Sequence, residues 1–466
     1  MVSSPAWLSA ADIAQAVSAG KMSATEVIEW QLARIEQLDP VLNAFTTVTA
    51  ERARAKAKAV DAAPDKGKLP LAGVPFAVKN LFDIEGVVTV AGSKINRDDP
   101  PAEQDAPLIA RLEAAGAVLV GALNMGEYAY DFTGENVHDG PSRNPHDTNH
   151  MTGGSSGGSG AAVAGGFVPL ALGSDTNGSI RVPSSLCGIF GLKPTYGRLT
   201  RARTFPFVAS LDHVGPFARS ATDLALSYDA MQGPDAEDPV CTKRAVEPVT
   251  PLLDRGLEGL RIAVAGGYFQ QGAFPEALDA LAHVAKAAGA RDEIEIPEAA
   301  RARAAAYVIS ATEGAALHLE RLRQRANDFD PAVRDRLLAA AMVPATAVNQ
   351  AQKFRRWYQT RVRALFNDYD AILAPATPCT APRIGQQTFV LDGVEMPVRP
   401  NLGLYTQPIS FVGLPVVAVP VPNSSPMSPL PIAVQVIAAP WREDVALRIA
   451  HALEQMGAAA APRPNL

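Results

Sequence analysis

Two segments rich in glycine and serine, together with one lysine, could carry chemistry in this chain. The first segment, residues 151–160, reads MTGGSSGGSG, and the second, GSDTNGSIR, contains Ser179. Upstream, Lys79 follows an apolar run in PFAVKN. A serine hydroxyl is a poor nucleophile unless a base lies beside it. A buried lysine can be that base, because burial lowers its pKa from the ordinary value of about 10.4. One interpretation of the set is therefore a serine nucleophile with a lysine base.

Two other interpretations of the glycine-rich segment have less support. A phosphate-binding loop needs either a Lys after its glycines or the pattern G-x-G-x-x-G, and the segment has neither. Gly153, Ser155 and Gly157 match the nucleophile elbow G-x-S-x-G, which requires a later His to activate the serine. The downstream histidines do not lie in comparable polar loops: His213, His283, His318 and His451.

The elements that must position these residues alternate between strand and helix after a helical start over residues 5–60. Apolar runs predict strands that end near Lys79, near Asn124 and at the segment Asp175–Ser179. Such alternation is typical of α/β proteins. The expected fold is therefore a large mixed, mostly parallel sheet covered by helices on both faces. The three polar segments then meet at the carboxyl ends of the strands, where these folds place their sites.

The 466 residues are expected to form a single domain, residues 1–466. Within it, we expect N-terminal helices over 1–65, the catalytic core over 66–230 and a helical cap over 296–366.

Composition and charge exclude several classes of protein. The formal net charge is −6 and no basic block stands out, which argues against nucleic-acid binding. No apolar stretch reaches the length of about 18 residues that a membrane span requires. The three cysteines form neither a metal pattern nor a disulfide framework, and no His/Cys/Asp ligand cluster is evident. We therefore expect a cytoplasmic protein that needs no metal and no organic cofactor.

An ordered set of motifs between roughly residues 70 and 220 resembles the amidase signature family. The set comprises LAGVPFAVKN, GALNMGEYAY, GPSRNP, GGSSGGSGAAVA, GSDTNGSIRVPSSLCGIFGLKPTYGR and SLDHVGP. Any one of these motifs could arise by chance, but their order along the chain is specific. The resemblance implies the amidase signature fold and an amidohydrolase that cleaves a linear C–N amide bond through a serine acyl-enzyme.

The same resemblance assigns roles to residues of this sequence. Ser179 is expected to be the acylated nucleophile, and Lys79 the base. Ser155 is expected to bridge them, with a cis peptide bond from Gly154. The oxyanion hole is expected from four backbone N–H groups: Thr176, Asn177, Gly178 and Ser179.

Two neighbours of these residues have expected structural roles. Asp175 is expected to brace the loop, and Arg181 to pair beneath it.

One departure from the family pattern bears on the substrate. Most members carry D-T-G-G-S before the nucleophile, whereas this chain has Asn177 in place of the first glycine. With AGSKINR, ILAPATP and VIAAPWRED, the chain resembles the branch of the family that hydrolyses 1-carboxybiuret in cyanuric acid breakdown. A small urea-derived anion would be bound by a cation and amide-matched groups. The candidates are Asn124, Arg336, Arg399, Tyr405 and Gln407.

Three alternatives remain open. TGEN, SRNP and LKPTYGR are shared with the glutaminase component, the A subunit, of a tRNA-dependent amidotransferase. A general small-amide amidase, such as an indoleacetamide hydrolase, and a non-catalytic relative are the others. The resemblance to the carboxybiuret branch also implies a small helical accessory subunit, with assembly into a homodimer or heterotetramer.

Overall fold

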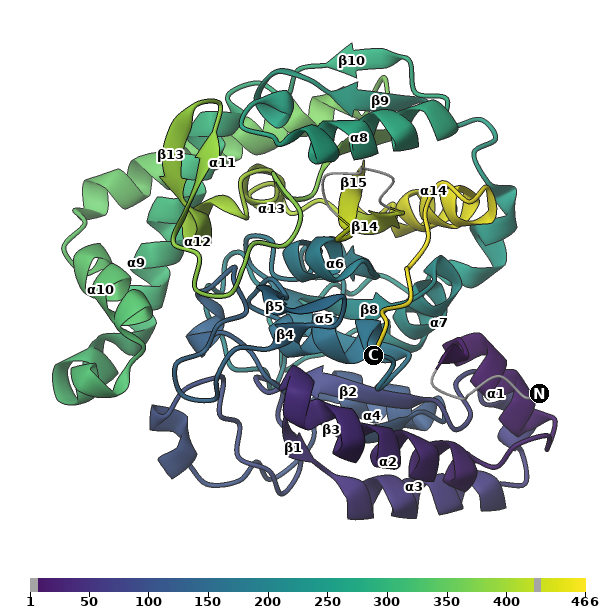
Figure 1. Cartoon of the computed structure of the whole chain (residues 1–466). Helices are drawn as coiled ribbons and strands as arrows, with labels where there is room; N and C mark the ends of the chain where they lie inside the picture. The colour runs from purple at the N-terminus through teal and green to yellow at the C-terminus, as the bar shows by residue number, and fades with distance from the viewer. Residues whose placement is uncertain (1–6, 423–428) are drawn as a thin grey trace.

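The computed structural model describes residues 7–422 and 429–466 (Figure 1). Its helices are α1 Ala10–Ser18, α2 Ala24–Leu42, α3 Ala50–Ala62, α4 Pro107–Ala114, α5 Gly157–Ala164, α6 Arg181–Cys187, α7 Ala221–Met231, α8 Pro275–Ala287, α9 Ala299–Arg325, α10 Pro331–Ala340, α11 Ala345–Leu365, α12 Val398–Asn401, α13 Gln407–Ser410 and α14 Glu443–Gln455. Its strands are β1 Phe45–Val48, β2 Pro75–Lys79, β3 Val118–Leu123, β4 Arg143–Asn144, β5 Asp147–Met151, β6 Leu170–Asp175, β7 Phe190–Lys193, β8 His213–Ala218, β9 Ile262–Ala265, β10 Asp292–Ile294, β11 Ala371–Pro375, β12 Thr388–Leu391, β13 Val394–Pro397, β14 Val416–Val421 and β15 Ile432–Ala438.

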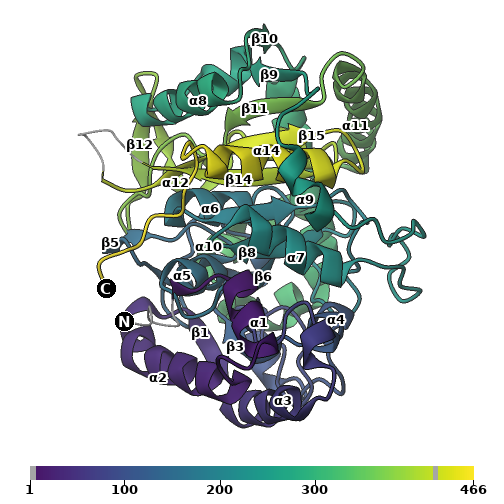
Figure 2. The same cartoon turned by 90° about the vertical axis from the view of Figure 1, so that its right-hand side faces the viewer.

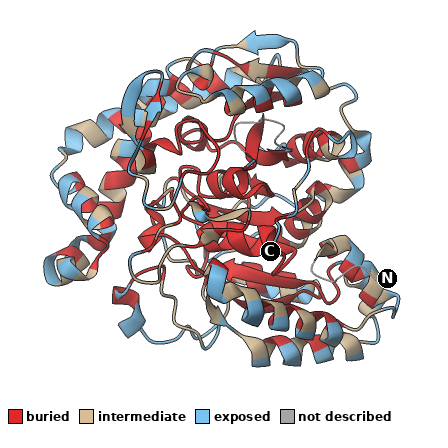
Figure 3. Cartoon of the chain, viewed as in Figure 1, coloured by how far each residue is buried: buried red, intermediate tan, exposed pale blue. Residues whose placement is uncertain are grey.

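Eleven strands form one mixed sheet in the order β1-β3-β2-β6-β8-β7-β14-β15-β11-β9-β10. Helices cover both of its faces. On one face α5 packs beside α6, and α6 contacts β14 and β15. On the other face α7 packs beside α14, which contacts the same two strands (Figure 2). The central strands are buried along their whole length, and exposed residues gather on the outer helices (Figure 3). The expected α/β class with a large mixed sheet is confirmed.

The sheet is less parallel than the alternation of strands and helices predicted. β2 runs parallel to β3 and β6, and β9 runs parallel to β10 and β11, whereas the remaining pairs in the sheet are antiparallel. Apolar runs cannot distinguish the two directions here, because strands covered by helices on both faces are buried throughout in either case.

The three strands predicted to carry the site are neighbours. β2 pairs in parallel with both β3 and β6, so the carboxyl ends of all three lie at one edge of the sheet. Lys79 is the last residue of β2, Asn124 follows β3, and the Asp175–Ser179 loop begins at the end of β6. The prediction that these polar segments share one rim is therefore confirmed.

The segments outside this core have two distinctive features. Residues 1–65 include the short edge strand β1, which pairs with β3, in addition to helices. Residues 296–366 are almost entirely helical and form α9, α10 and α11 at one side of the molecule (Figure 1). No helix within the described ranges is long and apolar enough to cross a membrane.

Candidate active site

The side chain of Lys79 ends in a cluster of serine hydroxyls. The residue is fully buried at the end of β2. Its Nζ lies 2.7 Å from Ser155 Oγ, 3.0 Å from Ser156 Oγ and 2.9 Å from Ser174 Oγ. Lys79 forms no ion pair with any carboxylate of the described residues. The amine is therefore solvated by hydroxyl groups alone.

This environment changes the protonation of the amine. Burial removes water from the ammonium form and lowers the pKa of Lys79 to about 7, although the distant charges of Asp212, Asp175 and Asp131 act in the opposite direction. At neutral pH a large fraction of the molecules therefore carries a neutral amine, which can accept a proton.

The glycine-rich segment 151–160 packs closely against neighbouring parts of the chain. The peptide bond between Gly154 and Ser155 is cis. A Cβ on Gly154 would lie 2.5 Å from Asp131 Oδ2, and one on Gly158 would lie 2.5 Å from the carbonyl oxygen of Ala44. A larger residue at either position would clash with these atoms, so close approach explains the two glycines.

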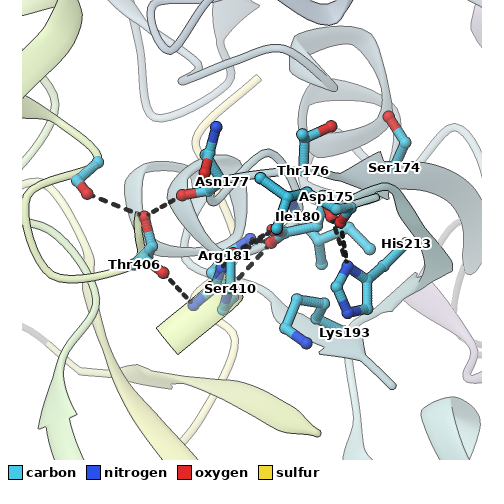
Figure 4. Close-up of polar contacts among 12 residues, drawn as sticks. Ser174, Asp175, Thr176, Asn177, Ile180, Arg181, Lys193, His213, Thr406 and Ser410 are labelled. Atoms are coloured by element: carbon cyan, nitrogen blue, oxygen red, sulfur yellow. Dashed lines mark hydrogen bonds and ion pairs between the residues drawn. The ribbon is translucent and has the colours of Figure 1, made fainter. Parts of the chain in front are cut away.

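The loop after β6 is held from beneath by a buried ion pair (Figure 4). The Arg181 guanidinium donates to both oxygens of Asp175 at 2.9 Å, and both residues are fully buried. Burial alone would raise the pKa of Asp175, but the charge and hydrogen bonds of Arg181 hold it well below its usual range. Asp175 Oδ2 also accepts from the backbone N–H of Ile180 at 3.2 Å. This arrangement matches the bracing role expected of Asp175 and Arg181.

The loop also presents free backbone donors. Within the described part of the chain, no acceptor receives a hydrogen bond from the backbone N–H groups of residues 176–179. Buried N–H groups without partners are rare in proteins. Gly178 adopts a φ of +146°, and a Cβ there would lie 2.2 Å from Thr406 Oγ1, so only glycine fits. The donors thus have the character of an oxyanion hole.

A cavity opens beside this loop. Its lining includes Ser179, which is 3% exposed, together with Thr176 and Asn177. The other lining residues are Ala129, Tyr130, Asp131, Phe132, Phe207, Tyr307, Ser310, Arg336, Pro400 and Gln407. Ser179 therefore lies in the wall of this cavity.

The structure brings two of the five predicted substrate-binding residues to this cavity, Arg336 and Gln407. The other three lie elsewhere and have partners. Asn124 donates to the carbonyl oxygens of Asn43 and Gly140. Arg399 pairs with Asp131 at 2.6 Å. The Tyr405 hydroxyl donates to the carbonyl oxygen of Gln271 at 2.6 Å.

Arg336 and Gln407 reach the cavity in fixed orientations. The Arg336 guanidinium lies 3.7 Å from the centre of the Tyr130 ring and forms no ion pair with a described carboxylate. Gln407 Oε1 accepts from Arg303 Nε at 2.8 Å. Because a guanidinium only donates, the amide N–H groups of Gln407 are left for other partners. The cavity thus combines an uncompensated positive charge with an amide donor.

Sequence reasoning missed several residues of the site. Ser156 and Ser174 contact Lys79 directly, and both stand next to residues that were singled out. Tyr307 and Ser310 come from α9, far away along the chain, where nothing in an Ala- and Arg-rich sequence marks them.

The histidines do not support the nucleophile elbow. His213 Nδ1 donates to the carbonyl oxygens of Leu211 and Asp175. Among residues 7–422 and 429–466, no histidine bonds to Ser155 or Ser156. Over the same residues, no group of three or more His, Cys, Asp or Glu is placed to hold a metal ion.

Comparison with known proteins identifies the family to which this chain belongs. The model of the family described as Amidase matches residues 26–447, and the chain belongs to the amidase signature family. It is an amidohydrolase.

Two curated relatives and one solved structure refine this placement. The chain is 54% identical to the 1-carboxybiuret hydrolase subunit AtzE of Pseudomonas sp. (strain ADP), over 96% of this chain and 98% of that protein. It is 38% identical to the A subunit of the glutamyl-tRNA(Gln) amidotransferase of Azotobacter vinelandii (strain DJ / ATCC BAA-1303), over 96% and 97% of the two chains. The solved structure is described as an unexpected vestigial protein complex that reveals the evolutionary origins of an s-triazine catabolic enzyme. It matches with a TM-score of 0.96 and 53% identity, over 98% of this chain and 100% of that one.

The buried Asp175–Arg181 pair should be essential for stability. Replacing Arg181 with Met leaves a buried carboxylate without its partner, which should lower the free energy of unfolding by about 3–5 kcal/mol. The midpoint of urea unfolding measures this change. The matched control is Arg54→Met, which breaks an exposed pair with Glu29 and should leave the midpoint almost unchanged. Equal midpoints for the two variants would contradict the assigned role of the pair.

Proposed function

We propose that this chain hydrolyses a small urea-derived amide such as 1-carboxybiuret and releases ammonia, with Ser179 as nucleophile, Ser155 as bridge and Lys79 as base. The observation that carries the proposal is the position of the Lys79 amine. It is buried, has a pKa near 7 and lies 2.7 Å from Ser155 Oγ, at the same edge of the sheet as the loop that carries Ser179.

The first half of the reaction follows from the hydrogen bonds around Lys79. The hydroxyl hydrogen of Ser156 is directed to the carbonyl oxygen of Ser174 at 3.2 Å, so Ser156 can only accept from the amine. The lone pair of the neutral amine is then available to Ser155. As Ser179 Oγ attacks the amide carbon, its proton passes to Ser155 Oγ, and the proton of Ser155 passes to Lys79 Nζ. The backbone N–H groups of residues 176–179 hold the developing oxyanion.

The second half returns the proton. When the tetrahedral intermediate collapses, the C–N bond breaks and the leaving nitrogen takes a proton from Ser155 Oγ. The proton held by Lys79 Nζ then passes to Ser155 Oγ. Ammonia departs and the acyl group stays on Ser179 Oγ. A water molecule then attacks the ester carbon and gives its proton to the same relay, so that the acid product leaves and the two serines and Lys79 regain their starting protonation.

The cavity supports a small anionic substrate. Arg336 contributes a positive charge that no described carboxylate neutralises, and Gln407 contributes an amide donor. A carboxylate and a carbonyl group on one small molecule are the matching partners. The similarity to a 1-carboxybiuret hydrolase supports the same choice of substrate.

We also propose that the chain works in a complex with a small helical accessory subunit, as a homodimer or heterotetramer. The support is the similar solved structure, which is described as a vestigial protein complex. The second candidate function is the glutaminase component of a tRNA-dependent amidotransferase, and the 38% identity to such a protein favours it.

A substrate panel tests the proposed function. Purified protein should release ammonia from 1-carboxybiuret or biuret and much less from glutamine or indoleacetamide. Ser179→Ala should lower kcat by at least about 10⁴-fold, because the acyl-enzyme cannot form. Ammonia release should be followed in a coupled assay for each compound. Rapid release from glutamine, with none from the urea-derived compounds, would favour the amidotransferase component instead.

The pH dependence should report the Lys79 amine. The neutral amine is the active form and is lost as the pH falls, so kcat/KM should drop about tenfold per pH unit below a pKa near 7 and level off above it. Lys193→Met is the matched control, because burial also lowers the pKa of Lys193 to about 7 although it touches neither serine. A profile that is flat from pH 5 to 9, or an acid limb that disappears in Lys193→Met, would contradict the assignment.

Arg336 should act mainly in binding. Arg336→Gln should raise KM for an anionic substrate about tenfold or more, and change kcat by less than about threefold. Arg334→Gln on the same helix is the control, because Arg334 pairs with Asp335 and does not line the cavity. Steady-state kinetics with the same substrate should separate the two variants. An unchanged KM in Arg336→Gln would remove this residue from the binding site.

A further inference from the structure

The side chain of Asn177 belongs to the cavity and not to the network beneath the loop. Asn177 is 7% exposed and lines the cavity together with Ser179. Figure 4 shows its side chain extending away from Arg181 and Lys193. Its Nδ2 donates to Ser310 Oγ on α9 at 2.8 Å. The catalytic loop is thus tied to the helical cap by this amide.

The hydrogen bonds of Ser310 fix which end of the amide faces it. Ser310 Oγ lies 2.8 Å from the carbonyl oxygen of Ala306 and donates its single hydrogen to that oxygen. The same hydroxyl can therefore only accept from Asn177, so Nδ2 must point toward α9. The amide oxygen Oδ1 is left on the other side, buried, with no hydrogen-bond partner among the residues that the structure describes.

A buried acceptor without a partner selects among ligands. A ligand that brings an N–H group to Oδ1 restores a hydrogen bond, whereas a ligand that brings a CH₂ group leaves the oxygen desolvated and unpaired. Gln407 and Arg336 line the same cavity. The free N–H groups of Gln407 can only donate hydrogen bonds, and the Arg336 guanidinium attracts anions. Asn177 Oδ1 is therefore placed to be the complementary acceptor.

We infer that Asn177 is a specificity residue whose Oδ1 accepts a hydrogen bond from the bridging N–H of a ureide, the nitrogen that stays with the acyl group attacked by Ser179. This inference rests on the proposed function. The leaving nitrogen must receive its proton from Ser155, which lies beside Lys79 at the sheet edge. Asn177 is instead tied to the cap through Ser310, so its oxygen is available to the part of the ligand that stays bound.

The test compares biuret with malonamide, in which CH₂ replaces the bridging N–H. Binding is measured by titration calorimetry in a Ser179→Ala background, so that neither compound is consumed. Biuret should bind about tenfold or more tightly than malonamide. Adding Asn177→Ala should bring the two dissociation constants within about twofold, mainly by weakening biuret. Ser310→Ala should also reduce the preference, because the amide can then rotate, and Ser310→Thr should retain it.

Several results would overturn the inference. They are equal affinities in the Ser179→Ala protein, a preference that survives Asn177→Ala, an unchanged preference in Ser310→Ala, and binding of neither compound. Turnover by the unmodified chain is measured separately and keeps the two proposals distinct. A binding preference that depends on Asn177, without ammonia release by the unmodified chain, would retain the hydrogen bond to Asn177 and refute the proposed function. Ammonia release without a binding preference would retain the proposed function and overturn the inference on Asn177.

Discussion

The burial of the Lys79 amine among hydroxyl groups is the constraint on which the proposed chemistry depends. An ammonium ion in this position would lose its water and gain no carboxylate, because its contacts are three serine oxygens. Its pKa consequently falls to about 7. The glycines of the segment 151–160 allow the close packing around this cluster, since a Cβ on Gly154 or Gly158 would clash with neighbouring atoms. A lysine can then perform the proton transfers for which many serine hydrolases use histidine.

Next to Ser174, which contacts Lys79, the Asp175–Arg181 pair shows the opposite electrostatic arrangement. Asp175 and Arg181 are equally buried, yet both remain charged because they pair bidentately at 2.9 Å. The neutral form of Lys79 is thus favoured because no opposite charge contacts its amine. Asp175 and Arg181 are charged because they contact each other. The pair fixes the loop that carries Ser179, and the strand ends fix Lys79 beside Ser155. The parallel triplet of strands brings both arrangements to one edge of the sheet.

The meeting of the polar segments could be predicted from the sequence, because Lys79 ends one apolar strand and Asn124 directly follows another. Parallel pairing then brings those residues to one rim. The roles of Lys79, Ser155 and Ser179 came from the family resemblance. Strand direction in the rest of the sheet was not predictable, since burial on both faces removes the alternation that would reveal it. The residues that α9 contributes to the cavity were also not predictable from the sequence. Ser310 and Tyr307 lie on a helix whose composition is ordinary, and only the packing of that helix over the loop gives them a role. Tyr405 and Arg399 stood near Gln407 in the sequence but are occupied by protein partners.

The separation of the site into two stretches of chain has a consequence for the choice of substrate. The residues proposed for bond cleavage lie between 79 and 179, on the sheet and its loops. A separate part of the cavity lining comes from a second stretch, residues 307–407: Tyr307, Ser310, Arg336, Pro400 and Gln407. Substitutions in the second stretch can remodel the wall while the strands that hold the first stretch stay untouched. A protein with this architecture can therefore change its amide substrate by substitutions in the second stretch, and a mutant library aimed at new amides should cover that stretch together with Asn177.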